Sequence, residues 1–332
     1  MQSGIIGDVY EVHTWTDRPI WPQGLSEPKG GPAIPADLDW DLFIGPTQKR
    51  PYNPAYTPWN WRGFWDFGTG ALGDMACHIM DPLYWALDLK YPTSVSASST
   101  LSNLYSPPQA QVVTYKFPAR PPKEKVNMPE LKVYWYDGGL LPDRPSELKD
   151  GEMMGDENGG IILIGTKGKI MTGCYGMNPT LLPTSKMADF TQPEPTIPRV
   201  KGGNGNIWAT NAHEQDWIRA CKETPSSRRE SSSNFQFSGP FNEMVVMGVL
   251  ATRLSGLQGL HRELQWDGEN MRFSNISPND KIKIVTVDEY AVIDGDPKFD
   301  RRFAEFNALD MANEWIKHTY HNGFSLPAMP NS

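Results

Sequence analysis

The sequence predicts an α+β fold: a large, mostly antiparallel open sheet with helices packed on one face and long loops rich in proline and tryptophan. Several strand-like segments alternate apolar and polar residues, as antiparallel strands with one solvated face do. Strands and helices occur in separate runs instead of strict β–α alternation, which favours α+β over a parallel sheet. Residues 18–66, crowded with Pro and Trp, are too long for an ordinary connection. We expect one large domain over residues 1–332.

Strands are expected where β-branched and aromatic residues gather between turn residues. The expected strands cover residues 9–16, 94–101, 111–117, 131–136, 160–164 and 169–172, with short strands near Leu264 and Met271. Before the first strand, Gly4 and Gly7 are typical of left-handed positions that follow a helix.

The clearest helix is predicted over residues 71–87, because Leu72, Met75, Ile79 and Leu83 recur at three- and four-residue spacing. Further helices are expected over residues 40–46, 209–222, 240–254 and 303–319. Pro240 is placed in the first turn of its helix, where the missing N–H costs little.

Composition excludes some classes of partner. The 332 residues carry a formal net charge of −8, whereas nucleic acids and anionic membranes attract basic surfaces. The longest apolar run is too short to cross a bilayer, so no membrane partner is expected. The three cysteines are far apart, which indicates reduced thiols and no disulfide framework. No signal peptide is visible, so the chain as given reads as cytoplasmic, and an export signal on a preceding segment would make it periplasmic.

A glycine motif at residues 68–73 fits the dinucleotide pattern G-x-G-x-x-G. That pattern needs a buried apolar strand immediately before it, and Trp61 to Phe67 is not such a strand. Asp74 would also repel a pyrophosphate placed there. We therefore interpret these glycines as residues that allow a tight backbone at the start of the helix.

Asp74 and His78 are the main candidates for catalysis. On a helix, side chains four residues apart lie on one face, and Asp81 and Trp85 continue the same row. A neutral imidazole with a carboxylate one turn away is suited to take a proton from a hydroxyl. A solvated polar face is the alternative interpretation, and a metal site would need a third ligand, for which His213 is the obvious candidate.

Other residues are candidates for substrate contact. Arg62 and Trp61 immediately precede the helix, and Trp65 belongs to the same aromatic loop. Indole faces stack on sugar C–H surfaces as well as on core neighbours, so both roles remain open for the tryptophans. His213 is equally compatible with a core or capping role.

The segment Gly70-Ala71-Leu72-Gly73-Asp74-Met75-Ala76-Cys77-His78-Ile79-Met80-Asp81 resembles the G-x-x-x-D-x-x-x-H-x-x-D segment of the glucose-fructose oxidoreductase / inositol dehydrogenase (Gfo/Idh/MocA) family. Residues 4–9, 159–165, 211–218, 307–308 and 320–324 resemble other stretches of that family's C-terminal domain. The resemblance implies that NAD or NADP is the cofactor, that a sugar, cyclitol or related polyol is the substrate, and that His78 is the acid/base beside Asp74. In the family, a Rossmann domain binds the cofactor, and a Glu-Lys-Pro motif supplies a catalytic lysine.

This chain contains no Glu-Lys-Pro, and we expect no Rossmann domain within it. It is therefore predicted to be a truncated, substrate-binding and acid/base half without dehydrogenase activity of its own. Two alternatives stay open: a cofactor-free carbohydrate lyase or hydrolase-like enzyme that uses Asp74 and His78, and a non-catalytic carbohydrate-binding or oligomerisation module. Since a one-sided sheet in this fold usually pairs with another subunit, a homo-oligomer formed through the sheet is also expected.

Overall fold

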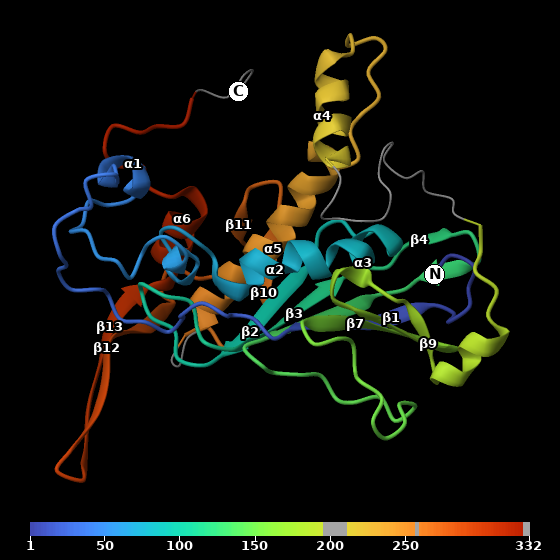
Figure 1. The fold of residues 1–332 in the computed structure, drawn as a ribbon, viewed down its shortest axis with the longest axis horizontal. Coiled ribbons are helices and arrows are strands. Elements are labelled where there is room, and N and C mark those ends of the chain that lie inside the picture. The colour runs from blue at the N-terminus through green and yellow to red at the C-terminus, as the bar shows by residue number, and fades with distance from the viewer. Residues whose placement is uncertain (195–210, 256–258, 328–332) are drawn as a thin grey trace.

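The computed structural model of the chain describes residues 1–194, 211–255 and 259–327 (Figure 1). Its centre is a nine-stranded sheet with the strand order β11-β10-β2-β3-β6-β1-β7-β8-β9. The strands are β1 (Val9–Thr16), β2 (Ser94–Ser99), β3 (Gln111–Phe117), β6 (Leu131–Asp137), β7 (Gly159–Gly165), β8 (Gly168–Gly173), β9 (Thr180–Leu182), β10 (Leu264–Asp267) and β11 (Arg272–Phe273). Strands β1 and β6 pair in parallel, and the other neighbouring pairs of this sheet are antiparallel. The predicted fold class is confirmed.

The helices lie mainly on one side of this sheet, and the helix over residues 212–222 projects away from it (Figure 1). They are α1 (Trp40–Ile44), α2 (Gly70–Ile79), α3 (Asp81–Ala86), α4 (Ala212–Lys222), α5 (Phe235–Ser255) and α6 (Ala308–Lys317). Short 3-10 helices occupy Asn60–Gly63, Cys174–Gly176 and Thr184–Asp189. Among the described residues, no helix has both the length and the apolar character that a membrane span requires.

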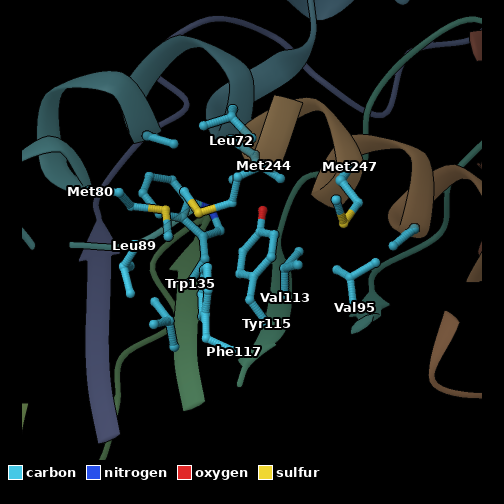
Figure 2. Close-up of a cluster of buried hydrophobic side chains, with 14 of the residues drawn as sticks. Leu72, Met80, Leu89, Val95, Val113, Tyr115, Phe117, Trp135, Met244 and Met247 are labelled. Carbon is cyan, nitrogen blue, oxygen red and sulfur yellow. The ribbon is translucent and has the colours of Figure 1, made fainter. Parts of the chain in front are cut away.

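The main core fills the space between α2, α5 and the central strands (Figure 2). Leu72 and Met244 project from the helices onto Val113, Tyr115 and Trp135 of the sheet. Each of these five side chains is fully buried. Helix α5 comes close to the sheet because Gly248 has no side chain: a Cβ there would lie 2.0 Å from the Tyr115 hydroxyl oxygen. The fixed position of α2 in this core is what aims Asp74 and His78 outward.

The opposite face of the sheet is covered in part by the loop after β6. Trp15, Ile162 and Met171 form a second buried cluster there with Leu148 of that loop. Beside this cluster, His13 of β1 stacks on Tyr134 of β6, with ring centroids 4.8 Å apart. His13 therefore contacts neighbouring residues of the sheet.

Two expected helices differ in their limits. The helix predicted over residues 71–87 is interrupted at Met80, and Pro82 follows in the first turn of α3. Proline has no N–H to donate to the carbonyl four residues earlier, so the hydrogen-bond ladder breaks there. Helix α5 begins at Phe235, five residues before Pro240, which therefore lies inside the helix and not in its first turn. The start of the helix predicted over residues 209–222 lies outside the described residues, and α4 begins at Ala212.

The prediction of a helix over residues 303–319 is wrong in its first part. Residues up to 307 belong to a long antiparallel hairpin of β12 (Lys281–Ile293) and β13 (Asp296–Asn307), and only α6 is helical. The hairpin projects from the body at the lower left of Figure 1. A smaller hairpin pairs β4 (Arg120–Lys123) with β5 (Val126–Met128).

Candidate functional site

The start of α2 is shaped by close backbone packing. Gly70 has a φ of +68°, and a Cβ there would lie 2.7 Å from the ring of Pro107. The N–H of Ala71, in the first turn of the helix, donates to the side-chain oxygen of Gln23 at 2.9 Å. The segment before these glycines contains the 3-10 helix Asn60–Gly63 and no strand. Gly70 therefore allows the tight backbone at the helix entry.

Arg62 and Asp74 meet at the exposed side of this helix entry. The Nε of Arg62 donates to Oδ1 of Asp74 at 3.1 Å, and both side chains are about three-quarters buried. The Arg62 guanidinium lies 4.3 Å from the ring centre of Trp59 and 4.4 Å from that of Trp61. A weakly hydrated, planar guanidinium is stabilised between two indole faces, so the cation has a fixed position.

This arrangement leaves hydrogen-bonding capacity unused. Arg62 uses Nε for the carboxylate and makes one long contact, 3.5 Å, from Nη1 to the carbonyl oxygen of Trp59. Within the described residues, the second carboxylate oxygen of Asp74 has no hydrogen-bond donor. A carboxylate and a guanidinium that share one aromatic-walled position can together accept from and donate to neighbouring hydroxyl groups.

His78 lies one helical turn beyond Asp74 and is exposed. Its ring meets the edge of Tyr175, with centroids 5.4 Å apart. Tyr175 comes from the turn after β8 and has a φ of +62°. Burial raises the pKa of Tyr175, so its phenol stays protonated near neutral pH. Sequence reasoning missed Tyr175, since only the fold brings this turn to α2.

The carboxylate of Asp74 is engaged by Arg62 and not by His78. Among the described contacts, the side chains of Asp74 and His78 share no hydrogen bond. Asp81 continues the row, and burial raises the pKa of Asp81 while the nearby charge of His213 lowers it. His213 of α4 thus lies within electrostatic reach of this row.

Trp65 and Trp85 have other neighbours. Trp65 donates from its indole N–H to the carbonyl oxygen of Asn103 at 3.0 Å and stacks on Arg253 of α5. Trp85 packs on Phe237, with ring centroids 4.6 Å apart. The structure therefore brings together Arg62, Trp61 and Asp74, with His78 one turn farther along α2. His213 lies within electrostatic reach of Asp81, and Trp65 packs against the core.

Metal ligation was the other chemistry considered for this row. Across the part of the chain that the structure describes, no three His, Cys, Asp or Glu side chains converge as metal ligands would. Cys77, next to His78, is a free exposed thiol.

Residues 17–117 match the family model described as "Oxidoreductase family, C-terminal alpha/beta domain" (GFO_IDH_MocA_C2). The resemblance to the Gfo/Idh/MocA C-terminal domain is confirmed. The matched segment begins at the aromatic loop, ends with β3, and contains Arg62, Asp74, His78 and Asp81. No curated protein matches the chain. The segment with the candidate site is thus similar to an oxidoreductase-type C-terminal domain, and the later resemblances noted in the sequence lie outside the match.

Proposed function

We propose that this chain is the substrate-binding and acid/base half of an NAD(P)-dependent oxidoreductase that acts on a sugar, cyclitol or related polyol. The observation that carries the proposal is the Arg62–Asp74 pair, held at 3.1 Å between two indoles and one turn from His78. The family match gives the reaction class, and the polar and aromatic chemistry of the site favours a polyhydroxylated substrate.

In this proposal, Asp74 and Arg62 orient the substrate. The free oxygen of Asp74 accepts a hydrogen bond from one hydroxyl group, and a free N–H of Arg62 donates to a neighbouring oxygen. Trp59, which is 48% exposed, offers an indole edge and face against which the C–H surface of a ring can pack. Fixing two adjacent hydroxyl groups in this way places one ring carbon reproducibly against α2.

His78 is the proposed proton acceptor. Oxidation of an alcohol removes the hydroxyl proton and a hydride from the same carbon, and this chain accounts for the proton alone. A neutral imidazole takes a proton well near neutral pH, and exposure of His78 allows that proton to pass to water. The ring of Tyr175 lies against that of His78 in an edge-type contact, which favours one orientation of the imidazole.

The described residues do not fit a dinucleotide. The glycine segment at 68–73 follows a 3-10 helix, and the N–H of Ala71 already donates to Gln23. The carboxylate of Asp74 would repel a phosphate placed there. The nine-stranded sheet is also mainly antiparallel, unlike a dinucleotide-binding fold. We therefore derive no hydride step from these residues.

The proposal is tested by sugar binding. Ligand-observed NMR and calorimetry with a panel of neutral monosaccharides and inositols would identify a ligand of the purified chain. We expect Asp74→Asn and Arg62→Met to weaken binding of that ligand by about tenfold or more, since each removes a hydrogen bond between the ligand and a charged group. His78→Gln should bind normally, because His78 is assigned to proton transfer.

The matched control is Asp150→Asn, an exposed carboxylate in the loop after β6. Unchanged affinity in both Asp74→Asn and Arg62→Met would contradict the proposal and favour a non-catalytic module. A reaction of a 3-keto sugar that needs no nicotinamide and disappears in His78→Gln would instead favour the lyase alternative.

A further inference from the structure

A hollow of about 460 Å³ is lined in part by Trp61, and the proposed function assigns no role to it. It is bounded by the segment around α1, by the end of the aromatic loop and by the tail after α6, which run beside one another at the left of Figure 1. The tail is fixed there: the N–H of His321 donates to the carbonyl oxygen of Pro46 at 2.9 Å. Its volume falls within the roughly 300–1,000 Å³ typical of small-molecule sites.

The walls of this hollow combine aromatic faces with a few polar groups. Phe43, Phe67 and Trp61 supply the apolar surface, and the rings of Phe43 and Phe67 lie 5.3 Å apart. Thr47 and His318 supply polar atoms beside them. Aromatic faces with a small number of placed hydrogen-bonding groups suit a ring that has both C–H surfaces and hydroxyl groups.

Thr47 gives an independent indication of a ligand. It is only 4% exposed, and its side-chain oxygen has no hydrogen-bond partner among the described residues. Asn322 of the tail donates to the carbonyl oxygen of Thr47 at 2.8 Å, which helps to fix the backbone beside the hollow. A buried hydroxyl without a partner is costly, and a hydroxyl of a bound ligand would remove that cost.

The charge of the hollow favours a neutral ligand. Asp66 lines it, and its carboxylate is paired with Arg50. The Arg50 guanidinium also lies 5.5 Å from the ring centre of Phe67, so it neutralises Asp66 from within the wall. Within the described residues, one oxygen of Asp66 has no donor and can accept from a hydroxyl. A phosphate or carboxylate would be repelled by Asp66, whose cationic partner Arg50 is already paired.

We infer that this hollow is a second sugar subsite, which takes the neighbouring ring of a disaccharide or glycoside. Trp61 joins the two places: it stacks on Arg62, the partner of Asp74, and it also lines the hollow. The assignment of the first ring to Asp74 and Arg62 rests on the proposed function, whereas sugar binding in the hollow rests on Thr47, Asp66 and the aromatic walls alone.

The test compares monosaccharides with their disaccharides on the full chain. Calorimetry is run with glucose and cellobiose, galactose and lactose, mannose and mannobiose, and xylose and xylobiose. At least one disaccharide should bind about tenfold tighter than its monosaccharide. Thr47→Val keeps the shape of the side chain and removes its hydroxyl. It should lower the affinity for that disaccharide by roughly three- to tenfold and leave the affinity for the monosaccharide unchanged. Asp66→Asn should act in the same direction.

Thr180→Val, on β9 at the other end of the sheet, is the matched control, and circular dichroism checks that each variant is folded. The inference is overturned if no disaccharide outbinds its monosaccharide, if no sugar binds, or if Thr47→Val leaves the preferred disaccharide unaffected. Arg62→Met separates the two claims. If Arg62→Met abolishes monosaccharide binding and no disaccharide binds tighter than its monosaccharide, the second subsite is refuted and the proposed function stands. If a disaccharide binds tighter than its monosaccharide and this difference depends on Thr47 but not on Arg62, the proposed function is refuted and the subsite stands.

Discussion

Asp137 should make the stability of this fold fall as the pH rises through neutrality. It ends β6 and is fully buried. Its carboxylate accepts from the backbone N–H of Gln111 at 3.1 Å, from the Gln111 side chain at 2.8 Å and from the Trp135 indole at 2.8 Å. Burial raises the pKa of Asp137 from 3.8 to about 7, although these three hydrogen bonds lower it.

The sign follows from proton binding. Between the two pKa values the native state holds a proton that the unfolded chain has released, so raising the pH favours unfolding. The penalty is absent below the unfolded pKa, grows through the range between the two values, and levels off above about pH 7. At ~1.4 kcal/mol for each pH unit, the full penalty is about 4 kcal/mol, of which roughly 3 kcal/mol develops between pH 5 and pH 8.

The assay is urea unfolding of the wild type and of Asp137→Asn across that pH range. The variant loses hydrogen bonds and will differ in absolute stability, so the informative quantity is the pH dependence of the difference. That difference should change by about 3 kcal/mol in favour of the variant as the pH rises. Glu263→Gln is the control, because the hydrogen bond from Lys116 holds the pKa of Glu263 below its usual range. A flat difference curve for Asp137→Asn would refute the reasoning.

Three further predictions concern packing and assembly. Leu72→Ala, which empties a fully buried position, should cost about 2–5 kcal/mol in urea unfolding, and a loss well under 1 kcal/mol would contradict the core assignment. Gly70→Ala should cost about 1–3 kcal/mol in the same assay, because it forces a Cβ against Pro107 at a positive φ, and an unchanged midpoint would argue against that backbone. We also propose that the sheet face around His13 and Tyr134 pairs with a second copy; light scattering should then show an oligomer that Tyr134→Glu dissociates, and a monomeric wild type would refute this.

Local patterns were sufficient for most of the central sheet and for α2. The strands over residues 111–117 and 160–164 were predicted because each consists of β-branched and apolar residues between turn residues, and burial of alternate side chains in β3 confirms the pattern. The stripe that begins at Leu72 predicted which face of α2 is buried, and that face packs on the sheet (Figure 2). A period in the sequence carries this information because burial follows directly from it.

The hairpin of β12 and β13 was missed although its turn signal is present. Asp294 and Gly295 have φ values of 53° and 85°, the left-handed pair that a two-residue hairpin turn requires. The apolar spacing from Phe303 onward resembled a helix and extended α6 backwards into the strand. Tyr290 and Phe299 face each other across the hairpin and are 71% and 78% exposed, so burial does not mark its strands.

The candidate site was predicted only as far as one helix reaches. Spacing placed Asp74 and His78 on one face of α2, but the partner of each comes from elsewhere: Arg62 from the aromatic loop and Tyr175 from the turn after β8. No periodic pattern in the sequence indicates either contact, because each depends on how a loop folds back onto the helix once the core has fixed the position of that helix. The same holds for the second hollow, where a tail residue near the end of the chain and Thr47 near its start share one wall. A site built by loops on a rigid core therefore needs the core before it can be recognised, and here the core is the α2–α5 layer on the sheet.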